Sequence, residues 1–172
     1  FQRGQEGDRV RAMEILTELE QAVPADTELM IVRAKCLLQN VTPESTQAAA
    51  QKLEHAVRQD PVAVPAYLML VDIALHERRF QKANQLVWQG LRYSPDNSAL
   101  LLAWAQVEMA QRHPDMAVDL ALQALRQDIK NTAAFALVLD VALKGNDVSS
   151  LEAMLALFNT GIERDPKNAE LW

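Results

Sequence analysis

Residues 64–97 read VPAYLMLVDIALHERRFQKANQLVWQGLRYSPDN, and residues 98–131 read SALLLAWAQVEMAQRHPDMAVDLALQALRQDIKN. When the two stretches are written one above the other, the small residues Ala83 and Ala117 fall at the same position. A small residue at a repeated position indicates a place where two helices approach closely, with larger residues filling the space around it. The two stretches therefore predict a helical repeat with a period of about 34 residues.

The prolines extend this period over the whole chain. Pro24, Pro61, Pro95 and Pro166 each close a helical segment, and the first two steps between them are each close to one period. The last step is close to two periods, and it divides into single ones if Ile129 takes the place of a missing proline. Two further positions keep the same phase in every unit, namely Ala12, Ala49, Ala83, Ala117 and Met154 at one, and Leu19, Ala56, Gly90, Ala124 and Gly161 at the other.

This pattern resembles the tetratricopeptide repeat (TPR) family, whose units are antiparallel pairs of helices, A and B. The resemblance covers essentially the whole chain and implies an all-α, right-handed α-solenoid of about five units, truncated at both ends. Arg33, Leu139 and Met154 depart from the family's pattern, and we expect those helix pairs to cross less closely. The alternative is a helical bundle without repeats. In the third unit the resemblance is carried by Tyr67, Leu70, Val71, Ala83, Val87, Gly90 and Pro95.

The repeat phase predicts where the helices lie. Gly7-Asp8 is expected to form the turn inside the first unit, and Thr42 and Asp147 offer side-chain oxygens that cap helix starts. Because neither end carries a polar capping helix, we expect the array to continue or a further domain to follow. The predicted units are 1–26, 27–63, 64–97, 98–131 and 132–168, with 169–172 starting another, and the predicted helices are 8–22, 26–39, 43–59, 64–77, 80–93, 97–112, 114–127, 131–144 and 148–164.

Composition excludes several classes of protein. Seventeen basic residues against 23 acidic ones give a net charge of −6, which argues against a nucleic-acid partner. Five glycines and seven prolines are few for an all-β chain, which needs many tight turns. One cysteine excludes an internal disulfide and a cysteine-rich metal site. No apolar run reaches the roughly 18 residues of a membrane span, so this segment is not expected to cross a membrane.

We find no constellation for catalysis, metal binding or a cofactor. The chain has no glycine-rich phosphate loop and no His-Glu-x-x-His motif. His55, His76 and His113 fall in different units without a second ligand one turn away, so we expect capping or surface roles for them. Cys36 is expected to be a small buried apolar residue. The sequence thus predicts no catalytic residue, no metal, no cofactor and no small-molecule substrate.

The TPR resemblance implies that the A helices line a concave groove in which a partner binds. That groove is predominantly apolar, and Met residues would let it adapt to its ligand. The family's clamp for a C-terminal carboxylate is missing, so an amphipathic helix or an extended apolar segment fits better. Asp72 and Asp140 either orient a peptide or pair with Lys35, Lys144 or Arg78. The predicted groove residues are Ile31, Lys35, Leu38, Leu68, Met69, Asp72, Leu75, Leu102, Gln106, Met109, Asp140 and Leu143.

Five repeats in phase without a catalytic constellation predict a non-catalytic scaffold that binds a protein or peptide partner. One alternative is a structural or assembly module of a larger bacterial envelope machine, such as an exopolysaccharide-export or pilus-assembly protein, in which self-association would matter. Another is an enzyme whose catalytic domain lies outside this segment. The helices rich in Gln and Ala resemble those of bacterial proteins of the periplasm or cytoplasm, and we favour the periplasm.

Overall fold

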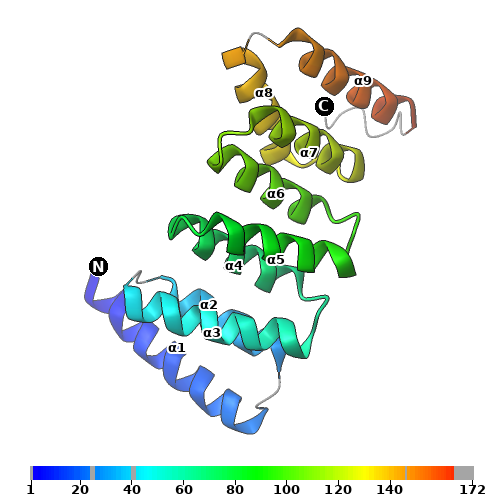
Figure 1. Cartoon of the computed structure of the whole chain (residues 1–172). Helices are drawn as coiled ribbons and strands as arrows, with labels where there is room; N and C mark the ends of the chain where they lie inside the picture. Colours follow the sequence, from blue (N-terminus) through cyan, green and yellow to red (C-terminus); the bar gives the residue numbers. More distant parts are fainter. Residues whose placement is uncertain (1, 24–25, 40–41, 146, 165–172) are drawn as a thin grey trace. The chain divides into compact units, whose positions relative to one another are not determined.

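The computed structural model describes residues 2–23, 26–39, 42–145 and 147–164, and every regular element in these ranges is an α-helix (Figure 1). The all-α prediction is therefore confirmed. The chain divides into two compact units, Phe1–Arg78 and Arg79–Trp172, which we describe separately. The division falls inside the predicted repeat 64–97, so the two helices of that repeat belong to different compact units.

In the part of the first unit that the structure describes there are four helices, and each packs against the next in the chain. The side chain of Asp26 accepts a hydrogen bond from the Leu29 N–H at 3.0 Å and so caps the second helix. Thr42 and Ser45 bond reciprocally at the start of the third helix, which satisfies two backbone donors that have no partner within the helix. The helices are α1 (Gln2–Ala22), α2 (Thr27–Leu37), α3 (Pro43–Gln59) and α4 (Val64–His76).

Helix α1 corrects one prediction. It runs without interruption through Gly7-Asp8, so the turn expected there does not form. The other residues before Gly7 are mostly Gln, Arg and Glu, which favour helix, and each of the two glycines in this stretch, Gly4 and Gly7, costs a helix only about 1 kcal/mol. The start of a further unit, predicted at 169–172, lies outside the described residues.

The core of the first unit lies where the repeat phase predicts it. Ala49 and Ala56 on α3 are fully buried together with Leu53 between them. On α1 the phase holds only in part: Leu16, the counterpart of Leu53, is buried, whereas Ala12 and Leu19 are exposed. The predicted turn would have let a preceding helix cover this face of α1, and that turn does not exist.

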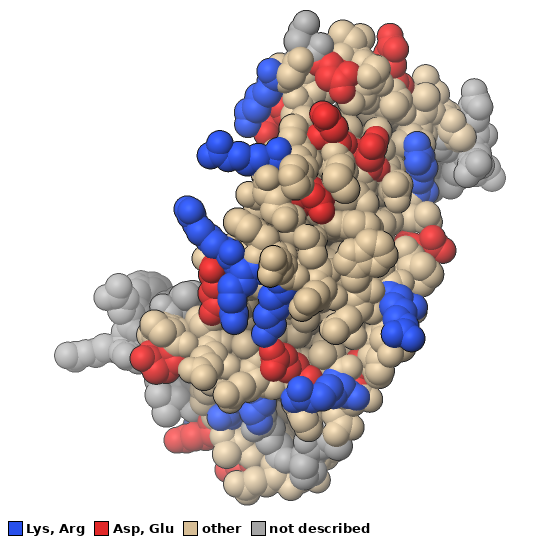
Figure 2. Space-filling view, viewed as in Figure 1, with Lys and Arg blue, Asp and Glu red and all other residues tan. Residues whose placement is uncertain are grey.

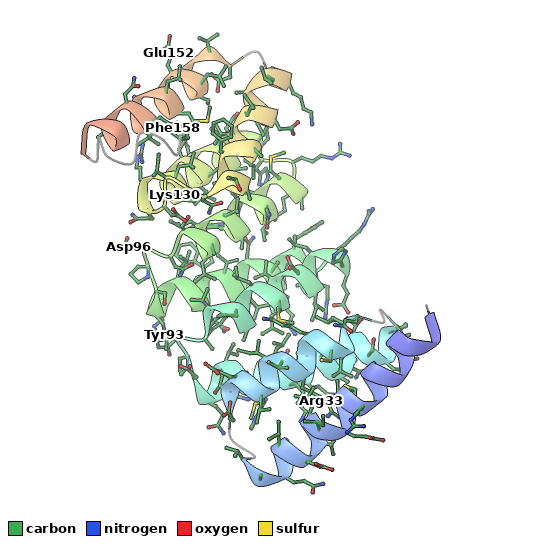
Figure 3. The ribbon with its side chains drawn as sticks, turned by 180° about the vertical axis from the view of Figure 1, so that it is seen from behind. Arg33, Tyr93, Asp96, Lys130, Glu152 and Phe158 are labelled. Atoms are coloured by element: carbon green, nitrogen blue, oxygen red, sulfur yellow. The ribbon has the colours of Figure 1, made fainter. Side chains whose placement is uncertain are left out.

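Arg33 replaces the large apolar residue usual at its repeat position, and the structure shows what it does instead. Its side chain reaches from α2 to α1 (Figure 3). There the guanidinium donates to the Met13 carbonyl at 3.2 Å and to the Thr17 hydroxyl at 2.9 Å. Polar contacts thus supplement apolar packing at the α1–α2 contact.

The described residues of the second unit form five helices; each packs on the next, and α7 also contacts α9. Asn97 and Asn131 cap the starts of α6 and α8 with their side-chain oxygens. The Asn131 amide donates to the Ser98 hydroxyl at 2.8 Å, and Ser98 donates to the Ala124 carbonyl at 2.9 Å. This chain of bonds ties α6, α7 and α8 together. The helices are α5 (Phe80–Tyr93), α6 (Ser98–Ala110), α7 (Pro114–Gln127), α8 (Thr132–Gly145) and α9 (Val148–Arg164).

Small residues line the helix contacts of this unit as the sequence predicts. Ala83, Ala117 and Ala124 are fully buried. In the last pair the larger Met154 is buried instead, and Phe135 meets Phe158 edge to face with ring centroids 5.6 Å apart. Outside α1, all helix bounds agree with the predicted ranges to within two residues. In the described part of the chain, no helix is both long and apolar enough to cross a membrane.

Candidate functional site

The predicted groove residues of the first unit lie on α2 and α4 and just after α2. Lys35 and Asp72 are exposed. Ile31 is a correction, because it is only 8% exposed and belongs to the core of this unit. Its neighbour Val32 is exposed instead, since one residue along a helix turns the side chain by about 100°. The remaining predicted residues are half-buried, namely Leu38, Leu68, Met69 and Leu75.

Among the predicted groove residues of the first unit, Asp72 has a carboxyl whose pKa is shifted. Although the residue as a whole is exposed, its carboxyl is partly shielded from water, which raises the pKa of Asp72 above its ordinary value, and the charge of His76 one turn later lowers it in part. The structure shows no hydrogen bond or ion pair from Asp72 to Lys35 or Arg78 among the described residues. Asp72 is thus a carboxylate held beside apolar side chains without a direct cationic partner in the described residues.

The predicted residues of the second unit lie on α6 and α8. Gln106 is exposed on α6, between the half-buried Leu102 and Met109. On α8 the Asp140 carboxylate accepts from the Lys144 ammonium at 2.7 Å, and both side chains are exposed. The pairing alternative therefore holds for Asp140. Leu143 is 65% exposed, which leaves an apolar side chain on the surface beside this pair.

A second surface feature was missed by the sequence analysis: an open hollow formed by α5, α6 and α7. It has a volume of about 630 Å³ and is centred on Trp88 and Trp104, whose ring centroids are 4.7 Å apart. Trp88 is 59% exposed. Uncharged side chains predominate over this part of α5 and α6 (Figure 2). The repeat pattern predicts that Trp104 is an interior residue. Only Trp88, one helix earlier, could have indicated an aromatic surface.

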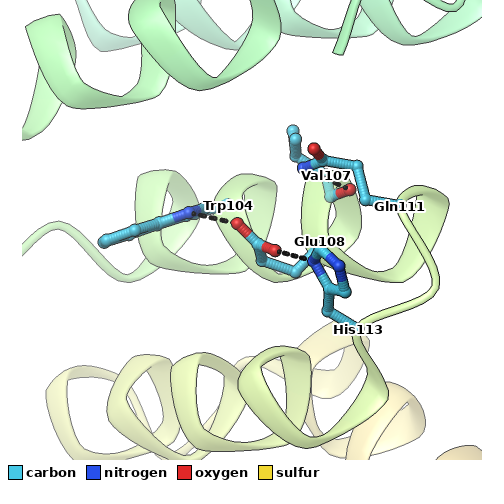
Figure 4. A network of polar contacts seen from close by, with 5 residues as sticks. All are labelled: Trp104, Val107, Glu108, Gln111 and His113. Carbon is cyan, nitrogen blue, oxygen red and sulfur yellow. Dashed lines mark hydrogen bonds and ion pairs between the residues drawn. The ribbon is translucent and has the colours of Figure 1, made fainter. Parts of the chain in front are cut away.

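A buried carboxylate positions one of the two tryptophans. Glu108 is 6% exposed, and its Oε1 accepts from Trp104 Nε1 at 3.0 Å (Figure 4). Its Oε2 lies 2.8 Å from Nδ1 of His113, at the start of α7. One turn of helix places Trp104 and Glu108 on the same face of α6. The carboxylate is therefore satisfied internally and fixes the Trp104 ring at the hollow.

The three histidines and Cys36 do not form a common site among the described residues. His55 Nδ1 lies 3.1 Å from the Met30 sulfur, and His76 stands in the last turn of α4. Cys36 is half-buried rather than fully buried as expected. Among the described residues there is no group of three or more His, Cys, Asp or Glu side chains that could hold a metal ion.

Comparison with solved structures identifies the fold. The crystal structure of MamA matches with a TM-score of 0.67 and 14% identity, over 95% of this chain and 94% of that one. TTC0263, a thermophilic TPR protein in Thermus thermophilus, matches at 0.66 and 19% identity, over 99% and 90%. YrrB, described as a TPR protein with an unusual peptide-binding site, matches at 0.62 and 20% identity, over 90% and 77%.

No family model and no curated protein sequence matches the chain. The structural matches nevertheless agree with the repeat period and with the helix pairs. The chain therefore has a TPR-like helical-repeat fold, as its sequence pattern predicts.

Proposed function

We propose that this chain is a non-catalytic scaffold that binds a protein segment along the outward faces of its A helices α2, α4, α6 and α8. The observation that carries the proposal is the apolar surface that these helices leave uncovered, most of all at Leu143. We call this surface the A-helix strip, and each compact unit carries its own part of it: Lys35, Leu38, Leu68, Met69, Asp72 and Leu75 in the first unit, and Leu102, Gln106, Met109, Asp140 and Leu143 in the second. Exposed apolar strips of this kind are typical of interaction sites.

The chemistry of the strip favours an apolar segment with a few polar groups. Leu68, Met69, Leu102 and Met109 supply partly exposed apolar side chains. Methionine side chains adapt to the shape of a ligand because they are unbranched and polarisable. Asp72 adds a carboxylate that can orient a partner carrying an amide or a cation. An amphipathic helix or an extended apolar segment matches this combination.

Charged substitutions in the strip test the proposal. Leu102→Arg, Met109→Arg and Leu143→Arg in the second unit, and Leu68→Arg in the first, should abolish capture of the proteins that the wild-type chain retains from a lysate. The matched controls are Met116→Arg and Val62→Arg, which alter exposed apolar residues outside the strip. Circular dichroism confirms that each variant is folded. Unchanged capture by all four strip variants would refute binding at the A helices.

Self-association separates the scaffold from the assembly-module alternative. A scaffold for another protein should keep a constant mass in light scattering as its concentration rises. A mass that rises with concentration, and that the strip substitutions reduce, would instead support a structural or assembly module.

A further inference from the structure

We propose that the hollow between α5, α6 and α7 is a second, separate binding site that takes an acidic, proline-containing peptide segment of another protein. It goes beyond the A-helix strip, because it uses a different face of α6. Trp104 and Leu101 line the hollow, while Leu102, Gln106 and Met109 belong to the strip. At 100° per residue the centres of these two faces are roughly 130° apart around the helix.

The aromatic part of the hollow is built to receive a flat apolar group. The Trp88 and Trp104 rings contact each other, with centroids 4.7 Å apart and planes tilted by 58°, so together they form one aromatic surface in the hollow. The bond from Trp104 Nε1 to the buried Glu108 fixes one ring of this surface. A preformed aromatic surface lowers the entropic cost of binding. Proline rings commonly dock against such aromatic surfaces.

The polar rim of the hollow is rich in hydrogen-bond donors. Within the described residues, neither the Trp88 indole N–H nor the Arg92 guanidinium has a hydrogen bond or an ion pair. Among the described residues that line the hollow there is no aspartate or glutamate, and the Gln89 and Gln123 amides complete its polar rim. Trp88 and Arg92 stand one helical turn apart on α5, so both donors face the same occupant.

These donors select the chemistry of the occupant. A ligand that satisfies them must supply acceptors: a carboxylate for Arg92, which binds carboxylates through paired N–H groups, and a backbone carbonyl for Trp88. Proline offers a carbonyl without bringing a competing N–H, and it holds a segment in the extended polyproline II form. The hollow is open to solvent, which suits an extended segment that lies across α5 and α6. A cationic segment would meet Arg92 without a compensating carboxylate in the lining.

Titration calorimetry of the purified chain with three synthetic peptides tests this proposal. The probe is acetyl-PPEPPEPP-amide, with acetyl-PPKPPKPP-amide and acetyl-AAEAAEAA-amide as controls for charge and for proline. We expect saturable binding of the acidic proline peptide only. Trp88→Ala and Arg92→Ala should each weaken it by about tenfold or more, and Arg92→Lys by less, because the lysine keeps the charge but loses the paired donors.

Matched variants separate this site from the A-helix strip. Arg126→Ala removes an exposed arginine of α7 that does not line the hollow, and it should leave the affinity for the peptide unchanged. Leu102→Arg should also leave it unchanged, so that failure of the strip and failure of the hollow are distinguishable. Three results would overturn the proposal: a Kd above about 1 mM for the acidic peptide, equal binding of either control peptide, or a mass that rises with concentration and returns to the monomer in Trp88→Ala.

Discussion

Oε2 of the buried Glu108 lies 2.8 Å from Nδ1 of His113, across the turn that joins α6 to α7. The other oxygen of the same carboxylate accepts from Trp104 Nε1. One side chain therefore connects the geometry of an inter-helix turn to the aromatic hollow of the second unit. A change at Glu108 should disturb both.

Replacing Glu108 tests this connection. Glu108→Ala leaves the Trp104 N–H without its acceptor, and we expect it to destabilise α6 and α7 by about 1–3 kcal/mol. Hydrogen exchange of the amides of these helices measures the loss, and tryptophan fluorescence reports the freed indole. Glu108→Gln keeps an acceptor and should lose less. Equal losses in the two variants would mean that the hydrogen bonds are not what stabilises this turn.

Arg112 follows the C-cap of α6 with a left-handed backbone and φ of 66°, and Arg78, one repeat earlier, has the same conformation with φ of 56° after the C-cap of α4. A residue with a β-carbon is strained there by about 1 kcal/mol, whereas glycine is not. Arg112→Gly should therefore raise the thermal midpoint of unfolding. Arg112→Ala retains the β-carbon and serves as the control. A midpoint that rises equally in both variants would point to the arginine side chain and not to the backbone.

The contribution of Asp147 to the stability of the second unit should depend on pH. Hydrogen bonds from Ser150 and Ser149 at the start of α9 lower the pKa of Asp147 below its ordinary value of 3.8. The ionised carboxylate therefore stabilises the fold above about pH 3.8, and this contribution disappears as the pH falls through the lowered pKa. Asp147→Ala should lower the unfolding midpoint at about pH 7 and have little effect at about pH 2.

The control for this pH dependence is Asp147→Asn, which keeps a capping oxygen without the charge. Its deficit should vary less with pH than that of the alanine variant. A deficit in Asp147→Ala that is the same at both pH values would show that the carboxylate charge is not involved.

The contribution of Asp72 to stability should change with pH in the opposite direction to that of Asp147. Because burial raises the pKa of Asp72, its ionised form opposes folding, and the favourable contribution of the protonated form is lost as the pH rises above 3.8. Asp72→Asn should therefore raise the unfolding midpoint at about pH 7, with the gain vanishing at about pH 3. A lower midpoint at neutral pH would reveal a stabilising partner for the carboxylate.

Arg33 should determine how firmly α1 is held. Arg33→Ala removes the bonds to the Met13 carbonyl and the Thr17 hydroxyl, and we expect severalfold faster hydrogen exchange in α1. Thr17→Val removes only one of these acceptors and should have a smaller effect. The amides of α9, in the other unit, provide the internal reference. Unchanged exchange in α1 would show that apolar packing around Leu16 alone holds this helix.

Local signals explain why most helix bounds follow from the sequence. Thr42, Asn97 and Asn131 cap helix starts within a few residues of themselves, and Pro43 suits a first turn that needs no N–H. The phase of the small residues also predicts Ala49, Ala83 and Ala117 as core, because equivalent positions of a repeated helix pair face the partner helix. The error at Gly7 arose where glycine and aspartate resemble a turn but the surrounding residues favour helix.

The sequence by itself thus determined the repeat period, the helix pairs and the absence of β-structure from the described residues, since these depend on contacts within one or two turns and on a repeated pattern. Only the tertiary structure decided which apolar side chains remain uncovered. It buried Ile31, left Trp88 exposed and enclosed the carboxylate of Glu108. The exposure of a side chain depends on the helices packed around it, and at Trp88 and Trp104 the hollow is completed by α7, a helix later in the chain than either residue.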